Sequence, residues 1–493
     1  MNEYSPRRRT ALVFTGSGTS GAYHAGVLRA LEESGVKIDL VVGSGAGTIA
    51  AAYAAVAGGA KLHGPGGFWE DLRWRSLFRL RPAAVVALGL LAASFAVFLL
   101  PVALALVAGL LFPLVLIADR IAPGAPSRVL GGLWLGPEAL SGPYLAALAM
   151  PIFALALLAM VTVVRLLLRD RRRLAESLES VLDAQPGRER LRRGLWEIAR
   201  GASLSAAPPS EAELGKRYVA LAVENLGQPG FREMVLRVAD LELAGPLSFV
   251  LLAEEHRAAF LAARGRRERG REGHPGPVDL TAPGQAELFF DAVLTGLLPP
   301  AAVPVRRLAF PKRGPFGGEV HRLTDATLLA TSGLAEALAA GAEQVILVSG
   351  TPLLPGPGPR RRGPWARLDA TVSLLERQAL ERDVSEAERV NRMVATLGHR
   401  AEDGSRAWQD PATGRVYREL ALYVIRPRRR LLGPLEIGGA RDPATEVAQT
   451  AADLLEQGYR DGHRQFVEPV VGAPPAGRRE EARDPDLAQP MEL

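Results

Sequence analysis

The fold is decided by the stretch Asp39-Leu40-Val41-Val42-Gly43-Ser44-Gly45-Ala46-Gly47. Its first four residues predict a buried β-strand, because short apolar runs that end in turn residues are typical of strands covered on both faces. The glycines that follow predict a sharp turn, and the small residues of 47–56 predict a helix after it. A strand, a glycine turn and a helix in this order have the shape of a nucleophile elbow, which many hydrolases write as G-x-S-x-G.

A similar unit precedes this stretch. The apolar run 11–15 predicts a strand, residues 22–33 predict a helix, and the loop between them reads Gly16-Ser17-Gly18-Thr19-Ser20-Gly21. Strand–helix–strand–helix with tight loops predicts an α/β fold, a mostly parallel sheet with helices on both faces. The loop also matches G-x-G-x-x-G, but a dinucleotide site needs an acidic residue at the end of the second strand, whereas Asp39 opens that strand.

The later part of the chain predicts further elements of the same sheet. We expect a strand pair at 218–223 and 234–240, a buried strand at 345–349 and a late strand at 420–425. Helices are expected at 171–199, 334–340 and 444–458. The segment 264–277 is charged and glycine-rich, which predicts a loop, and the chain from Gly472 has the composition of a disordered tail.

Composition narrows the possible partners and chemistry. The 493 residues contain no cysteine, which excludes disulfides, thiol nucleophiles and cysteine metal sites, and we expect neither a metal nor a cofactor. The net charge is +6 and comes from arginine, with lysine only at Lys37, Lys61, Lys216 and Lys312. A basic chain suits nucleic acid or an anionic membrane surface. The apolar segments described next favour the membrane surface, so we expect no nucleic-acid partner.

Two uncharged segments predict membrane insertion. Residues 144–164 would form a helix about 31 Å long, which matches a hydrocarbon core of about 30 Å. Residues 83–118 are too long for one straight span, and Pro101 and Pro113 could kink that helix or divide it. Because the sequence on both sides belongs to one soluble domain, the number of crossings should be even. We therefore expect a transmembrane helical hairpin over 83–168, with 119–143 as the far-side loop; the alternative is a buried helix pair in a large soluble core.

Arginines flank these segments and predict their orientation. The far-side loop carries few arginines, and the positive-inside rule then places both flanks in the cytoplasm. An arginine- and alanine-rich, lysine-poor chain also suggests a GC-rich bacterial genome, so we expect two spans in a bacterial inner membrane. Residues 1–10 are basic but have no apolar core and do not predict a signal peptide. The flanking arginines are Arg73, Arg75, Arg79 and Arg81 before the hairpin and Arg165, Arg169, Arg171, Arg172 and Arg173 after it.

The two glycine turns on neighbouring strands resemble the patatin-like phospholipases. The likeness covers roughly residues 10–60 and 215–465, and it is carried by residues 21–28, 295–304, 323–327 and 455–459. The resemblance implies a three-layer fold, an oxyanion hole in the first glycine loop and a Ser–Asp dyad that needs no histidine. Carried over, the oxyanion hole falls on Gly16, Ser17 and Gly18, the elbow on Gly43, Ala46 and Gly47, the nucleophile position on Gly45 and the dyad aspartate on Asp325.

The departures from the family pattern bear on activity. Gly45 stands where the serine should be, and no G-x-S-x-G occurs elsewhere in the chain. Acyl transfer through a serine ester is then impossible at this position, although backbone N–H donors could remain. Ser20 replaces a basic residue that the family usually carries, and Ala326 and Thr327 replace glycines. Three hydroxyls could substitute for the serine but are more simply explained as local caps or backbone partners: Ser17, Ser44 and Thr48. His24 could suggest a general base, but the family motif often carries this histidine without catalytic use.

Together these patterns predict how the chain is divided into domains and what the protein does. The expected parts are a basic segment 1–10, a patatin-like domain formed by 11–80 and 169–465, the hairpin 83–168, and a disordered tail 466–493. We expect a membrane-anchored pseudoenzyme of lipid metabolism whose cleft binds membrane lipids or acyl chains. The alternatives are an active lipid acyl hydrolase, with a substitute nucleophile or with Gly45 as an engineered change, and a membrane structural protein without a ligand.

Overall fold

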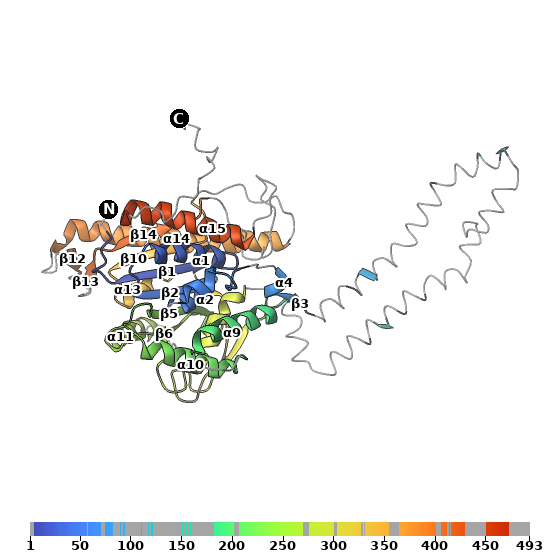
Figure 1. Cartoon of the computed structure of the whole chain (residues 1–493), viewed down its shortest axis with the longest axis horizontal. Coiled ribbons are helices and arrows are strands. Elements are labelled where there is room, and N and C mark those ends of the chain that lie inside the picture. Colours follow the sequence, from blue (N-terminus) through green and yellow to red (C-terminus); the bar gives the residue numbers. More distant parts are fainter. Residues whose placement is uncertain are drawn as a thin grey trace. The chain divides into compact units, whose positions relative to one another are not determined.

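The computed structural model divides the chain into two compact units, residues 1–79 with 184–493 and residues 80–183 (Figure 1). It describes residues 4–56, 58–70, 74–81, 182–201, 207–269, 276–299, 303–326, 331–353, 364–400, 406–411, 416–428 and 450–472, together with 329, 414 and isolated positions between 89 and 161. Most of the expected hairpin 83–168 and the residues after 472 lie outside this set. Among the described residues, no helix combines the length and apolar character needed to cross a membrane.

The central sheet of the first unit is mostly parallel, as the sequence predicted. Its order is β14 (Ala421–Ile425), β10 (Gln344–Ser349), β1 (Thr10–Gly16), β2 (Leu40–Gly45), β5 (Glu233–Asp240), β6 (Gly245–Leu251) and β7 (Val278–Asp279). The strands from β14 to β5 run parallel, and β6 turns back antiparallel to β5. β9 (Val320–Thr324) pairs with the last residues of β5, and β8 (Arg306–Ala309) pairs with β9.

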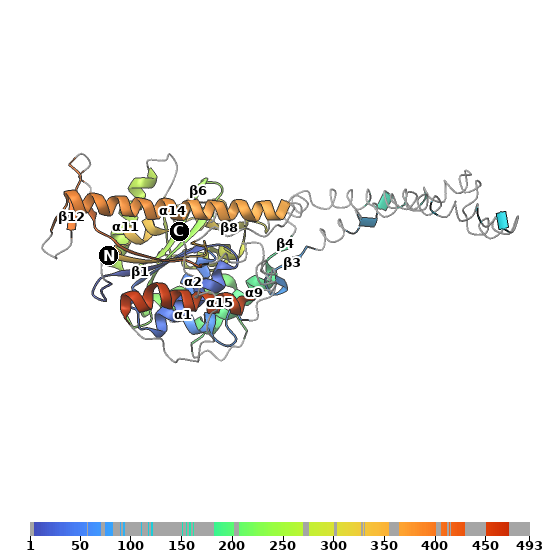
Figure 2. The same ribbon diagram turned by 90° about the horizontal axis from the view of Figure 1, so that it is seen from above.

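Helices cover both faces of this sheet (Figure 2). One face carries α1 (Ser20–Glu33), α2 (Gly47–Ala54) and α15 (Ala451–Gly462), and the other carries α11 (Glu254–Arg269), α13 (Leu334–Ala339) and α14 (Pro364–Leu397). A strand buried on both faces needs apolar residues at every position, and β1 and β2 accordingly read as continuous apolar runs. Further helices are α3 (Gly59–His63), α4 (Trp74–Leu77), α9 (Gln185–Ala199), α10 (Glu211–Glu224) and α12 (Phe289–Leu294).

Alternation along the strands sorts their side chains between the two layers. Ala11 and Val13 of β1 and Leu40 and Val42 of β2 belong to the core formed with α11, α13 and α14. The side chains between them face α1 and α2, since successive residues of a strand point to opposite faces. Two small sheets complete the described part: β3 (Arg79–Leu80) with β4 (Leu182–Asp183), and β11 (His399–Arg400), β12 (Arg406–Gln409) and β13 (Val416–Arg418).

The first and last helices approach each other backbone to backbone. A Cβ at Gly26 of α1 would lie 1.8 Å from the carbonyl oxygen of Leu455 of α15, and a Cβ at Gly458 would lie 2.2 Å from that of Tyr23. Tyr23 Oη also donates to Asp461 Oδ2 at 3.2 Å. Only glycine fits at positions 26 and 458, which gives a packing reason for two residues of the family-like segments.

Three expectations differ from the structure. Residues 218–223, predicted as a strand, lie within helix α10, whose N-cap Ser210 accepts a hydrogen bond from the backbone N–H of Glu213. Part of the charged segment 264–277 continues helix α11 to Arg269. The disordered tail was expected from 466, but a π-helix spans His463–Val471, with Phe466 and Val467 fully buried, so the ordered part extends to Gly472.

Candidate functional site

The site lies where β1 and β2 end side by side. The two strands are parallel and in register, so Thr15 pairs with Ser44 and Gly16 with Gly45. Each strand runs directly into a glycine turn and then into a helix, α1 or α2. Both turns therefore meet at the carboxyl edge of the sheet, the edge at which open α/β sheets bind their ligands.

The elbow at Gly45 is a tight left-handed turn. Gly45 has φ of 63°, a conformation that glycine adopts without strain and other residues rarely adopt. The N–H of Ala46 donates to the carbonyl oxygen of Gly16 at 2.8 Å, which ties the turn to the neighbouring strand. The elbow glycines Gly43 and Gly47 also touch, because a Cβ at Gly43 would lie 2.5 Å from the oxygen of Gly47.

Asp325 follows β9 and faces the same point. Its side chain is fully buried, and its backbone N–H donates to the carbonyl oxygen of Leu298 at 3.4 Å. A Cβ built on Gly45 would lie 2.9 Å from Asp325 Oδ1. The structure thus brings Gly16, Gly45 and Asp325 together, and a side chain at position 45 would point at the carboxylate.

The same construction shows that position 45 has no room for a side chain. A Cβ there would lie 2.6 Å from the carbonyl oxygen of Gly16, well inside van der Waals contact, and this oxygen belongs to rigid backbone. In a nucleophile elbow, the N–H of the residue after the nucleophile is one of the oxyanion donors. At Ala46 this N–H is already bonded to Gly16, so the elbow presents neither a nucleophile nor that donor.

The first glycine loop already holds a carboxylate. The backbone N–H of Ser17 donates to Glu376 Oε1 at 2.7 Å, and Ser17 Oγ donates to the same oxygen at 2.9 Å. Glu376 reaches the loop from helix α14. Of the residues expected to form an oxyanion hole, Ser17 therefore binds an anion that belongs to the chain itself, Gly16 directs its carbonyl oxygen to Ala46, and Gly18 forms the turn with φ of 56°.

The hydroxyls near the elbow have other positions or partners. Thr48 Oγ1 lies 2.9 Å from the carbonyl oxygen of Gly45 and 3.0 Å from that of Val293, so its hydroxyl is engaged with backbone acceptors. Ser44 pairs with Thr15 and follows Val42 by two residues, so strand alternation directs its side chain toward α13 and α14, away from the direction of a Cβ at Gly45.

His24 is structural. Its Nε2 lies 3.1 Å from the carbonyl oxygen of Thr15, so this nitrogen carries the proton and donates. Burial lowers the pKa of His24 to about 3, and the hydrogen bond to Thr15 only partly opposes this effect. The ring is therefore neutral near pH 7 and packs against Phe14 at a centroid distance of 5.3 Å.

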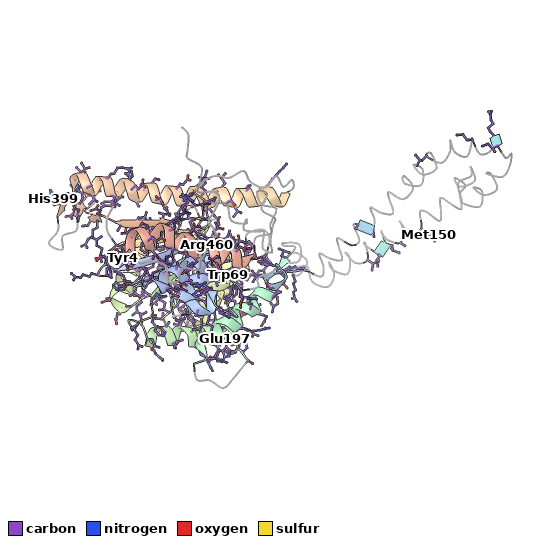
Figure 3. All side chains as sticks on the ribbon, turned by 45° about the horizontal axis from the view of Figure 1, so that its top comes forward. Tyr4, Trp69, Met150, Glu197, His399 and Arg460 are labelled. Atoms are coloured by element: carbon purple, nitrogen blue, oxygen red, sulfur yellow. The ribbon has the colours of Figure 1, made fainter. Side chains whose placement is uncertain are left out.

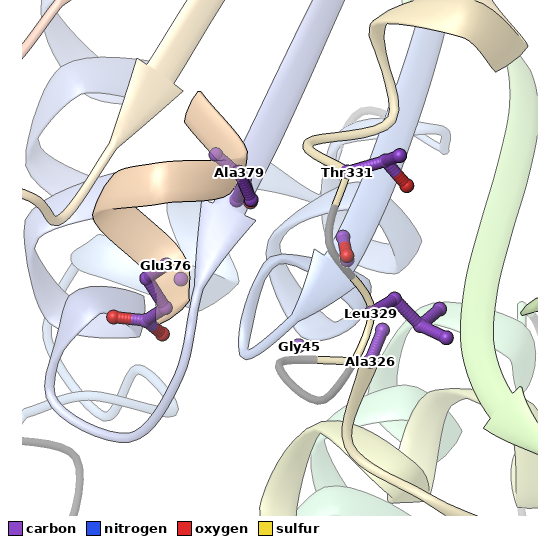
Figure 4. Close-up of a pocket in the computed structure, with 9 residues that line it drawn as sticks. Gly45, Ala326, Leu329, Thr331, Glu376 and Ala379 are labelled. Carbon is purple, nitrogen blue, oxygen red and sulfur yellow. The ribbon is translucent and has the colours of Figure 1, made fainter. Parts of the chain in front are cut away.

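A narrow pocket opens between the elbow and α14, with room for about one water molecule. Figure 4 shows Glu376 and Ala379 of α14 on one side and Ala326, Leu329 and Thr331 on the other, with Gly45 between them. The backbone at Thr331 is fixed by Arg237, whose Nη1 donates to the Thr331 carbonyl oxygen at 3.0 Å. The pocket is lined by Thr15, Gly16, Ser44, Gly45, Ala326, Leu329, Thr331, Glu376 and Ala379.

The end of the glycine loop packs against Trp69, a buried side chain that is labelled in Figure 3. A Cβ at Gly21 would lie 2.0 Å from an atom of the Trp69 ring, so the start of α1 rests directly on the indole. Within the described part of the chain, no cluster of His, Asp and Glu side chains is arranged to hold a metal ion.

Sequence reasoning missed Glu376. Its helix, α14, follows a proline- and glycine-rich segment, and a single acidic residue on a helix gives no sign that it accepts from a serine 359 residues earlier in the chain. A usable signal was the pair Glu376 and Asp383, seven residues apart on a helix whose same face buries Ala379 and Leu380. Acidic residues on the apolar stripe of a helix indicate polar partners inside the fold.

One comparison with known proteins covers the part of the chain that contains both glycine turns. The family model described as patatin-like phospholipase matches residues 12–201, which confirms the resemblance seen in the sequence; Asp325 lies outside the matched range. Among solved structures, the crystal structure of VipD from Legionella pneumophila is matched with a TM-score of 0.31 and 12% sequence identity, over 94% of this chain and 67% of that chain. No curated protein matches the chain.

Proposed function

We propose, on the premise that residues 12–201 belong to the patatin-like phospholipase family, that this chain is a membrane-anchored pseudoenzyme of lipid metabolism. It keeps the scaffold of a lipid acyl hydrolase and acts by binding lipid or acyl groups at the edge formed by β1 and β2. It does not hydrolyse them. The loss of hydrolysis is supported by the absent serine, the blocked Cβ position at Gly45 and the occupied N–H groups of Ala46 and Ser17.

The observation that carries this proposal is the contact between Gly45 and Gly16. A Cβ at position 45, where an active elbow carries its serine, would lie 2.6 Å from the carbonyl oxygen of Gly16. The missing hydroxyl is therefore accompanied by a backbone arrangement that leaves no space for it. The Ala46 and Ser17 N–H groups also have partners within the chain, so two donors that could stabilise an oxyanion are occupied.

The membrane anchor is proposed from the sequence of residues 83–168. Two uncharged segments flanked by arginines suit a helical hairpin with both ends in the cytoplasm. The pairing of β3 with β4 supports such an insertion, because it holds the two ends of the segment side by side. The proposed surroundings are a bacterial inner membrane with its anionic lipids, and the proposed ligands are membrane lipids or acyl chains.

Hydrolysis is tested with the purified full-length protein in mixed micelles. Fluorogenic acyl esters should be turned over no faster than by micelles alone, while an active patatin-like enzyme in the same micelles serves as the positive control. A fluorophosphonate probe that reacts with activated serines should leave the chain unlabelled. Turnover together with labelling at Ser44 or another hydroxyl would replace this proposal with an active hydrolase that uses a substitute nucleophile.

Lipid binding is tested separately, by extracting the protein and analysing the lipids that co-purify. A defined lipid or fatty acid should accompany the chain at a stable molar ratio through successive columns. A matched membrane protein of similar span number, purified in parallel, controls for annular lipid. Lipid content equal to that of the control would favour a structural role in the membrane without a bound ligand.

A further inference from the structure

Helix α14 is fastened to neighbouring loops by two similar contacts. Ser17 donates its backbone N–H and its hydroxyl to Glu376 Oε1, at 2.7 and 2.9 Å. Ser332 donates the same pair of groups to Asp383 Oδ2, at 2.6 and 2.7 Å. The two acidic residues are seven positions apart, which is about two helical turns, so they lie on one face of α14.

The two contacts differ in what surrounds them. Glu376 lines the pocket beside Gly16 and Gly45, whereas Asp383 is not one of the residues that line it. Both carboxylates fasten the helix, but Glu376 also places a negative oxygen on the loop that would receive the polar end of a ligand. Asp383 is therefore a natural internal control for Glu376.

The pocket that this arrangement leaves is small. The remaining space is about that of one water molecule, and Ala379, one turn beyond Glu376, is buried against it. A ligand carboxylate can accept both hydrogen bonds from Ser17 only if the Glu376 side chain leaves the loop. A fatty-acid carboxylate entering while Glu376 stays would also meet a like charge a few ångströms away.

From this geometry we propose that the Glu376 carboxylate occupies the position on the glycine loop that a ligand carboxylate would take. A fatty-acid carboxylate binds the Ser17 donors in competition with it. This inference rests on the proposed lipid-binding function and names its ligand class. Two donors converging on one oxygen suit a carboxylate, because charge-assisted hydrogen bonds are stronger than neutral ones. A fatty alcohol has no charge to be repelled by Glu376 and gains less from the Ser17 donors.

The test compares two probes on three forms of the full-length protein in nanodiscs: wild type, Glu376→Gln and Asp383→Asn. The probes are a pyrene-labelled fatty acid and the pyrene-labelled alcohol of the same chain length, and empty nanodiscs give the background. Glu376→Gln should bind the acid about tenfold more tightly than wild type, because the competing charge is gone. Its affinity for the alcohol, and both affinities of Asp383→Asn, should stay within about twofold of wild type.

The possible outcomes distinguish a failure of competition by Glu376 from a failure of the proposed lipid binding. If all forms bind both probes and Glu376→Gln gains no more affinity for the acid than Asp383→Asn does, competition by Glu376 is wrong while lipid binding stands. If no form binds either probe, the proposed lipid binding fails and the inference fails with it. Should Glu376→Gln not fold, as judged by its melting temperature, Glu376→Ala provides the same comparison.

Discussion

At the residue scale, position 45 is constrained both by its backbone angle and by its neighbours. Gly45 has φ of 63° and a Cβ position blocked by the Gly16 carbonyl oxygen. Gly35 has a similar φ of 66°, but nothing lies within 4 Å of its Cβ position. The two glycines therefore separate the cost of an unfavourable backbone angle from the cost of a steric clash.

We expect Gly45→Ser to destabilise the fold without creating an esterase. The substitution adds backbone strain of about 1–3 kcal/mol, and displacing the Gly16 carbonyl adds more. The control, Gly35→Ala, should lose only about 1 kcal/mol, because its side chain points into open space. Denaturant unfolding measures both losses, and ester turnover is measured on the folded fraction. A Gly45→Ser protein as stable as wild type and active on esters would show that the elbow is still a working one.

His24 should make the fold sensitive to acid. Burial holds its folded pKa at about 3, below the unfolded value of about 6.5, so only the unfolded chain binds this proton as the pH falls through that window. Stability is complete above pH 6.5 and declines below it by at most about 1.4 kcal/mol per pH unit. His24→Gln should be less stable at pH 7 but should lose less stability between pH 6.5 and 4.5. Equal losses in the two proteins, measured by urea unfolding, would contradict this prediction.

At the scale of elements, the contact of α1 with α15 depends on two glycines. Intrinsic helix propensity favours alanine over glycine by about 1 kcal/mol, so Gly26→Ala would be stabilising in an isolated helix. Here a Cβ would lie 1.8 Å from the Leu455 carbonyl oxygen and would push α15 away. We expect a loss of several kcal/mol and earlier proteolytic release of the C-terminal segment. Stabilisation of the folded protein by Gly26→Ala would show that the helices can separate freely.

The elements that could be predicted from sequence are those whose signal is local. Residues 11–15, 345–349 and 420–425 are largely apolar runs, and they form β1, β10 and the edge strand β14 of the main sheet. The prediction of a strand at residues 218–223 was wrong, because a short run of apolar residues fits a buried helix as well as a strand. The N-cap at Ser210, with Glu213 three residues later, was the local signal that a helix starts there.

The candidate site shows the same limit of sequence reasoning. The glycine turns are local motifs, and the structure places Gly16 and Gly45 opposite each other because parallel strands in register end at one edge. Two decisive contacts are not local: the Gly16 oxygen at the Gly45 Cβ position, and Glu376 on Ser17. Both depend on how strands and helices distant in sequence pack, which neither propensity nor periodicity encodes.

At the scale of the whole molecule, the insertion should be separable from the first unit, residues 1–79 with 184–493. Arg79 and Leu80 pair with Leu182 and Asp183, so a short turn can join these strands in place of residues 82–181. We expect this shortened chain to be recovered in the supernatant after ultracentrifugation, with a circular dichroism spectrum typical of an α/β protein. The full chain should remain in the membrane pellet after a carbonate wash. Recovery of both chains in the supernatant would contradict a membrane-spanning role for the insertion.

The order of strands in the sheet also determines when each strand can pair during synthesis of the chain. β1 and β2 leave the ribosome early, but their outer neighbours in the sheet are β10, which begins at Gln344, and β5, which begins at Glu233. At about 5–20 residues per second, the edge of β1 stays unpaired for tens of seconds. Residues 80–183 emerge within that interval, ahead of either neighbour. The first two strands therefore lack their outer neighbours throughout the synthesis of residues 80–183.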